Sequence, residues 1–170
     1  EKGFHEASIS GITRSAGVAL GTFYTYFDSK DAVFRALVSD MSAGVGKAAR
    51  EALDPSMGAL EIERVALRAF LEFAAEHKEI YRIIDEAEFV DPDSYRAHYE
   101  TIGSRIEERL KLGGESGEFA PGLGTPEAWA VMGMNVFLGL RYVIWGREGD
   151  PDFEEIARRA NMLLTRGIAS

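Results

Sequence analysis

The chain has 170 residues, of which 46% are hydrophobic and 28% charged, a composition that excludes an intrinsically disordered protein. It contains no cysteine, which excludes disulfides, thiolate metal sites and a cysteine nucleophile and makes the cytoplasm the expected compartment. The net charge is −9, but residues 1–40 are almost neutral, with four basic against five acidic side chains. An acidic chain with a nearly neutral N-terminal segment suits a protein that binds nucleic acid through one small surface, although an acidic enzyme could carry the same charges.

Two short helices are predicted between residues 8 and 27. Ser8 can cap the first, which ends at Gly17, where a left-handed conformation costs little. In the second, the stretch ALGTFYTYF places Leu20, Phe23 and Phe27 at i, i+3 and i+7. That spacing is helical, so it favours a helix over the alternative of a buried strand.

A longer helix is predicted from Asp28 or Ser29 to about Leu53, where DPSMG breaks it. The most apolar stretch, residues 128–140, is shorter than the roughly 18 residues that span a bilayer, so we expect a buried helix and no membrane partner. Strand-like alternation is absent, and the fold class should be all-α. The further predicted helices cover residues 59–77, 78–90, 92–112, 126–146 and 150–168, with a Gly-rich loop at 113–125.

The two short helices, joined at a tight corner, are typical of a helix-turn-helix, whose second helix enters the major groove of DNA. Gly21 would let the backbone of this helix approach DNA closely, because it has no Cβ. Threonine hydroxyls and methyls can contact base edges, and tyrosine hydroxyls can reach phosphates. Each residue alone is ordinary core or surface, but together they favour DNA binding.

The stretch SISGITRSAGVALGTFYTYFDSKDAVFRAL resembles the DNA-binding signature of the tetracycline-repressor (TetR) family, through its AGV, GTFYTYF and SK elements. The resemblance implies a homodimer that binds palindromic operator DNA and releases it when a small molecule enters the C-terminal domain. It also implies base-facing or groove-facing positions at Ala19, Gly21, Thr22 and Thr25, phosphate contacts at Tyr24, Tyr26 and Lys30, and weaker backbone contacts at Ser10 and Arg14.

The sequence departs from the family pattern in three places. Thr13 stands where alanine is common, which is expected to loosen helix packing slightly, and Leu20 replaces a residue that is often polar, so base readout should be sparse. The opening EKGF resembles the end of the family's first helix, most of which is missing from the sequence. The domains expected are a truncated helix-turn-helix domain over 1–40 and a helical ligand-binding and dimerisation domain over 41–170.

The second domain should hold the effector in a cavity between its helices. Asn135 and Arg141 stand out because polar groups in the most apolar helix are costly without partners. Arg141 could bind a ligand carboxylate or pair across a dimer interface, and we favour the interface. The effector expected is small and apolar or aromatic, and it can carry one acidic group. The candidate contacts, for which ordinary core packing is the alternative, are Phe70, Phe73, Tyr81, Phe89, Tyr99, Met132, Asn135 and Arg141.

The last two helices carry apolar faces too broad for a monomer and should form a four-helix dimer interface. The side chains expected there are Trp129, Met132, Val136, Leu140, Val143, Ile156, Met162 and Leu163. The long helix from Ser29 connects the two domains, so an effector that shifts it would change the spacing of the recognition helices.

An acidic cluster lies near His98 in the sequence, but its spacing does not reproduce a metal-binding motif. We therefore expect no metal, no cofactor and no catalytic residues. A small all-α enzyme that uses these carboxylates, or an adaptor that binds only protein, remain alternatives. The members of the cluster are Asp85, Glu86, Glu88 and Asp91.

Overall fold

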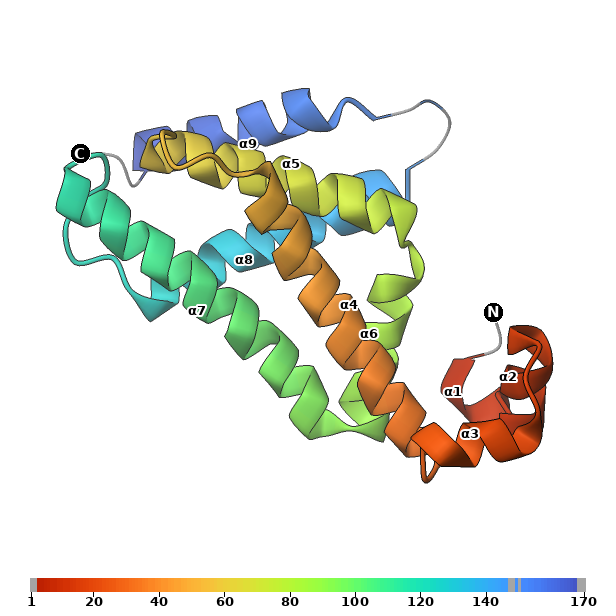
Figure 1. Ribbon diagram of the computed structural model, residues 1–170. Coiled ribbons are helices and arrows are strands. Elements are labelled where there is room, and N and C mark those ends of the chain that lie inside the picture. Colours follow the sequence, from red (N-terminus) through yellow and green to blue (C-terminus); the bar gives the residue numbers. More distant parts are fainter. Residues whose placement is uncertain (1–2, 147–148, 150, 168–170) are drawn as a thin grey trace. The chain divides into compact units, whose positions relative to one another are not determined.

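A computed structural model describes residues 3–146, 149 and 151–167, without the side chains of residues 166 and 167. All regular elements in this part of the chain are helices, which confirms the all-α prediction (Figure 1). The helices are α1 (Gly3–Glu6), α2 (Ile9–Ala16), α3 (Leu20–Tyr26), α4 (Lys30–Ala52), α5 (Ala59–Glu76), α6 (Glu79–Val90), α7 (Pro92–Ser116), α8 (Thr125–Gly139), the π-helix η1 (Leu140–Ile144) and α9 (Phe153–Gly167).

The chain divides into two compact units. The first contains Glu1–Ser42 and Glu79–His98, and the second contains Ala43–Lys78 and Tyr99–Ser170. The first unit therefore includes α6 in addition to the helix-turn-helix segment. Both α4 and α7 begin in the first unit and end in the second.

Local capping sets the limits of α2 as the sequence predicts. The Ser8 hydroxyl accepts a hydrogen bond of 3.1 Å from the Gly11 N–H, which satisfies one of the free donors of the first turn. Gly17 ends the helix with a φ of 69°, a left-handed conformation that glycine adopts without a steric penalty. The turn closes when the N–H of Val18 bonds to the Thr13 carbonyl at 3.0 Å. These contacts fix the corner that leads into α3.

The second unit is built around α5, which packs along α9 (Figure 1) and also contacts α8 and η1. Its core cluster includes Ile106 and Leu110 of α7, Met132 of α8, and Phe119 from the connection between these helices. Phe119 and Leu110 are almost fully buried, so this connection is anchored to the core rather than left as a free loop.

Two helix ends differ from the sequence prediction. Helix α7 runs on to Ser116 instead of ending at residue 112, because glycines 113 and 114 continue the helical hydrogen bonding until Gly117 adopts a φ of 81°. The predicted single helix over 126–146 ends as a π-helix, in which the Trp145 N–H bonds to the Leu140 carbonyl at 2.9 Å. π-helical segments are rare and occur frequently at functional sites.

Candidate DNA-binding surface and effector cavity

Helix α3 presents the predicted contact residues to solvent. Tyr24 is 54% exposed and Tyr26 is 75% exposed, whereas Phe23 is only 6% exposed and packs against Phe27 with a centroid distance of 5.7 Å. The aromatic rings of this stretch thus divide between anchoring the helix and facing outward. The other exposed candidates are Ser10, Arg14, Ala19, Gly21, Thr22 and Thr25.

Gly21 is the second residue of α3, and a Cβ built on it would meet none of the described atoms within 4 Å. Packing inside the protein therefore does not require a glycine at this position. A glycine in a helix costs about 1 kcal/mol relative to alanine. Because Gly21 has no side chain, the backbone of α3 is uncovered at this position, and a molecule outside the chain can approach it closely.

The hydroxyls near this surface have different partners. The Thr25 hydroxyl donates to the Gly21 carbonyl at 3.2 Å, and the hydroxyls of Ser8 and Ser10 lie 3.2 Å apart. The Thr22 hydroxyl has no hydrogen-bond partner in the part of the chain that the structure describes. Of the two threonine hydroxyls on α3, that of Thr22 is therefore the one available to a partner outside the chain.

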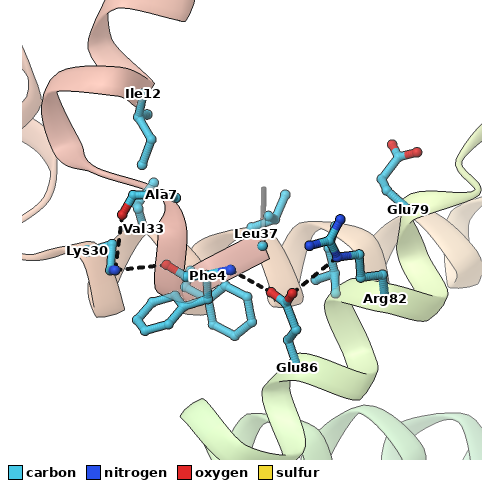
Figure 2. Close-up of a pocket in the computed structure, with 12 residues that line it drawn as sticks. Phe4, Ala7, Ile12, Lys30, Val33, Leu37, Glu79, Arg82 and Glu86 are labelled. Carbon is cyan, nitrogen blue, oxygen red and sulfur yellow. Dashed lines mark hydrogen bonds and ion pairs between the residues drawn. The ribbon is translucent and has the colours of Figure 1, made fainter. Parts of the chain in front are cut away.

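Thr13 and Lys30 have internal roles that the sequence did not reveal. The buried Thr13 hydroxyl donates toward the carbonyls of Ile9 at 3.1 Å and Ser10 at 3.2 Å, so it is satisfied inside α2. The Lys30 ammonium donates to the carbonyls of Phe4 at 2.8 Å and Ala7 at 3.1 Å (Figure 2), and it lies 4.3 Å from the centre of the Phe4 ring. Lys30 thus joins the start of α4 to the segment around α1, and only one of its N–H groups is left for DNA.

Glu86 belongs to the acidic cluster of the sequence, but it holds α1 against α6. Its carboxylate accepts a hydrogen bond of 2.8 Å from the Phe4 N–H and one of 3.2 Å from the Arg82 guanidinium (Figure 2). These groups border a cavity of about 450 Å³ within the first unit, whose other walls include Phe34 and Leu37. The cavity is not lined by any of the predicted effector contacts.

A second, smaller cavity of about 70 Å³ lies within the second unit, between α4, α5, α7 and α8. Three of the eight predicted effector contacts line it: Phe70, Met132 and Asn135. Its remaining walls are Val45, Gly46, Ala49, Ala66, Ile102, Arg105, Ile106, Arg109 and Val136.

The other five predicted contacts do not line this cavity. Tyr81 and Phe89 belong to the first unit, and Phe89 is 81% exposed. The ring of Phe73 packs against that of His77 at a tilt, with a centroid distance of 4.5 Å, and Tyr99 packs against the core cluster of the second unit. The spacing of residues along a helix shows which of them share a face, but it does not show which faces of different helices line the same cavity.

Arg141 also lies away from the cavity, exposed on η1, with its guanidinium 5.3 Å from the centre of the Tyr142 ring. The cations that line the cavity are Arg105 and Arg109, which sequence reasoning missed. A signal for them existed, because they follow Ile102 and Ile106 at spacings of three residues and therefore share a face of α7 with them.

A buried carboxylate neutralises one of these two arginines. Glu63 on α5 has a side chain only 1% exposed and accepts hydrogen bonds from Arg109 Nε at 2.6 Å and Nη2 at 3.1 Å. Two parallel bonds of this kind fix both side chains and compensate their charges. Arg105 forms no ion pair or hydrogen bond with any residue that the structure describes.

The acidic cluster near His98 is not assembled into a metal site. Among residues 3–146, 149 and 151–167 there is no group of three histidine, aspartate or glutamate side chains that could hold an ion. Partial burial and the nearby negative charge of Glu88 raise the pKa of Asp85. The buried imidazole of His98 is hydrogen-bonded to Ser42. Within the same described residues, no helix is both long and apolar enough to cross a membrane.

Comparison with known proteins supports the interpretation of the N-terminal segment. Residues 1–37 match the family model described as bacterial regulatory proteins, tetR family. Over nearly the whole chain the protein is 25% identical to the HTH-type transcriptional regulator YhgD of Bacillus subtilis (strain 168), covering 99% of this chain and 89% of that protein.

Two solved structures share the fold. The transcriptional regulator FadR from Bacillus subtilis, in complex with stearoyl-CoA, superposes with a TM-score of 0.80 at 20% identity, covering 98% of this chain and 91% of FadR. The fatty acid degradation regulator FadR from Bacillus halodurans gives a TM-score of 0.80 at 23% identity, covering 98% and 88%. Together with the helix-turn-helix of α2 and α3, the family-model match and the HTH-type relative support a DNA-binding transcriptional regulator of the TetR family, and the two solved structures share its fold.

Proposed function

We propose that the protein is a repressor that binds palindromic operator DNA as a homodimer and releases it when a small apolar or aromatic effector enters the second unit. The observation that supports DNA binding is the set of residues exposed on α3. Two exposed tyrosines, a threonine hydroxyl without a partner among the described residues, and the open backbone at Gly21 all belong to this short helix.

On this proposal the residues of α3 divide into two roles. Ala19, Gly21, Thr22 and Thr25 face the bases or the groove, because short side chains let the helix enter deeply. Tyr24 and Tyr26 contact phosphates together with the remaining N–H of Lys30. Ser10 and Arg14 add backbone contacts from α2, which crosses the phosphate chain.

The effector site proposed is the cavity lined by Phe70, Met132 and Asn135. Its volume of about 70 Å³ is less than half of the roughly 150 Å³ of a protein cavity that binds benzene. Any effector of that size or larger must push the surrounding helices apart. One of them is α4, whose residues Val45, Gly46 and Ala49 line the cavity and whose first half belongs to the DNA-binding unit. This movement would couple the effector to operator release.

The FadR neighbour was crystallised with stearoyl-CoA, which is a long apolar chain joined to a polar carrier. That chemistry agrees with an apolar effector here. The cavity volume of about 70 Å³ supports a molecule smaller than stearoyl-CoA for this protein.

A dimer is supported by the apolar surface of α8, η1 and α9. Phe137 and Leu163 are each 67% exposed and Trp145 is 60% exposed. Met132 and Val143, which the sequence placed on this surface, are instead 4% and 6% exposed and belong to the unit's own core. Exposed apolar surface of this kind marks an interaction site.

Selection from a random-sequence duplex library tests the function without knowledge of the operator. We expect the recovered sequences to be palindromic, with affinity that falls steeply as salt rises. Thr22→Ala should change the recovered sequence, whereas Tyr26→Phe should weaken binding to all duplexes by a similar factor. Recovered sequences without twofold symmetry would contradict the proposal. So would variants that recover the same sequences as the unaltered protein and bind them with the same affinity.

A further inference from the structure

We propose that the cavity of the second unit is specific for small aliphatic carboxylates, and that Arg105 binds the carboxylate group. This inference rests on the proposed effector site and adds the chemical class of the effector. It also replaces Arg141, the cation that the sequence suggested, with an arginine that lines the cavity.

The charges around the cavity leave one positive group without a counterion. Two arginines line it, and Glu63 binds Arg109 through two hydrogen bonds. Arg105 is half-buried and makes neither an ion pair nor a hydrogen bond with a described residue. A guanidinium held next to apolar walls gains most from an anion that accepts two of its N–H groups, and a carboxylate has the matching planar geometry.

Gly46 makes room for this arginine. A Cβ at Gly46 would lie 2.7 Å from Arg105 Cζ, so any other residue there would displace the guanidinium from the surface of α4. Gly46 is buried and lies inside a long helix, where glycine is unfavourable. The close packing of Arg105 on the α4 backbone gives this glycine a reason to be there.

The remaining walls of the cavity are suited to the hydrocarbon end of the ligand. Its walls are mainly aliphatic side chains and Met132, with Phe70 as the aromatic ring. Asn135 is the second polar group, and its side-chain amide has no partner among the described residues. The amide N–H can donate to the second carboxylate oxygen. An anionic group at one end and a short hydrocarbon chain at the other are the features that these walls complement.

Calorimetry with sodium hexanoate and hexanamide at pH 7 tests the charge directly. The two probes have the same chain length, but only hexanoate carries a negative charge. We expect hexanoate to bind at least about tenfold more tightly, as a charge-assisted pair requires. Arg105→Gln should remove this difference while hexanamide affinity changes by less than about twofold. Arg50→Gln, an exposed arginine of α4 away from the cavity, should leave both affinities unchanged.

Gly46→Ala provides a second variant that keeps the arginine. The added methyl displaces the flexible end of Arg105, so the fold should persist, and hexanoate affinity should fall toward that of hexanamide. Equal affinities of the two probes for the unaltered protein would overturn the inference. An unchanged preference for hexanoate in Arg105→Gln, or no binding of either probe, would overturn it as well.

The calorimetric experiment needs no DNA, so it can be separated from the proposed function. If duplex selection succeeds and hexanoate does not bind, the carboxylate inference is wrong and the repressor proposal stands. If hexanoate binds through Arg105 but its affinity is the same with and without operator, the inference stands and the effector-controlled release is wrong, because linkage between the two sites is reciprocal.

Discussion

The Ser42 hydroxyl and the His98 imidazole share a hydrogen bond of 2.6 Å that ties α4 to α7 within the first unit. The hydroxyl also lies 2.8 Å from the Val38 carbonyl, which can only accept, so its single hydrogen points there. His98 Nδ1 must therefore donate to Ser42. Burial lowers the pKa of His98 to about 4, so the ring is neutral at pH 7 with its proton on Nδ1.

The lowered pKa of His98 should make stability depend on pH. Between pH 4 and 6.5 the unfolded chain binds a proton at His98 that the folded protein does not, so the free energy of unfolding should rise as pH increases through this range. The contribution is up to about 3 kcal/mol, at about 1.4 kcal/mol per unit of pKa. Urea denaturation at pH 4.5 and pH 7 measures it.

His98→Gln isolates this effect from the carboxylates that titrate in the same range. The glutamine amide can still donate to Ser42, but it has no proton to gain. The stability lost between pH 7 and pH 4.5 should therefore be smaller in the variant than in the unaltered protein. His5→Gln, which changes an exposed histidine, should behave like the unaltered protein. Parallel pH profiles for His98→Gln and the unaltered protein would show that the buried ring is not the cause.

Gly21→Ala should separate DNA binding from folding. The new methyl meets nothing within the chain, and alanine favours a helix by about 1 kcal/mol, so thermal stability should stay the same or increase. Operator affinity should nevertheless fall, because the methyl prevents close approach of the α3 backbone. Thermal unfolding and fluorescence anisotropy on a selected duplex measure the two effects. An affinity equal to that of the unaltered protein would remove Gly21 from the proposed DNA contacts.

Lys30→Met should destabilise the first unit. The variant keeps most of the aliphatic stem but leaves the Phe4 and Ala7 carbonyls without their charged donor, at a cost of about 1–3 kcal/mol. Arg35→Met, an exposed residue of the same helix, should cost less than about 0.5 kcal/mol. Chemical denaturation compares the two. If their stabilities are equal, the bonds made by Lys30 contribute no net stability.

Glu63 and Arg109 should behave as a coupled pair. Glu63→Leu alone leaves a charged guanidinium without its partner and should cost about 3–5 kcal/mol. Adding Arg109→Leu removes that orphaned charge, and most of the lost stability should return. Denaturation of both single variants and the double variant gives the coupling energy. Strictly additive losses would mean that the two side chains do not depend on each other.

The helix-turn-helix could be predicted because its signals are local. The Ser8 cap and the left-handed Gly17 act within a few residues of the helix they limit. The i, i+3, i+7 spacing in α3 predicted the burial of Phe23, which is 6% exposed, but Leu20 of the same set is 51% exposed. The family signature covers the same short segment, residues 1–37. Local sequence was therefore enough for the fold class and for the buried position of Phe23, but not for the exposure of Leu20.

The positions that could not be predicted depend on contacts distant in sequence. Lys30 turns inward because it meets carbonyls near α1, more than twenty residues away. The sequence drew attention to Arg141 because it interrupts an apolar stretch, but the packing of α7 against α4 and α8 places Arg105 in the cavity. The π-helix at Leu140 has no sequence signal that we recognise, since its residues would also suit an ordinary α-helix.

Leu163→Glu should produce a monomer. Leu163 is 67% exposed on α9, where it borders a surface hollow with Leu138 and Tyr142. A twofold axis through this surface would bury Leu163 on both protomers. A glutamate buried without a partner at such an interface costs about 2 kcal/mol or more in each protomer, and the loss counts twice per dimer. Multi-angle light scattering at micromolar concentration should show a dimer for the unaltered protein and a monomer for the variant.

Leu112→Glu is the matched control for the dimer. Leu112 is 57% exposed on α7, so the same substitution adds the same charge to a comparably exposed leucine outside the proposed interface. This variant should remain dimeric and keep operator affinity, whereas Leu163→Glu should lose affinity because a monomer contacts only one half-site. A monomeric unaltered protein would contradict the homodimer. If both variants dissociate equally, added charge and not the α9 surface accounts for the change, and the interface must lie elsewhere.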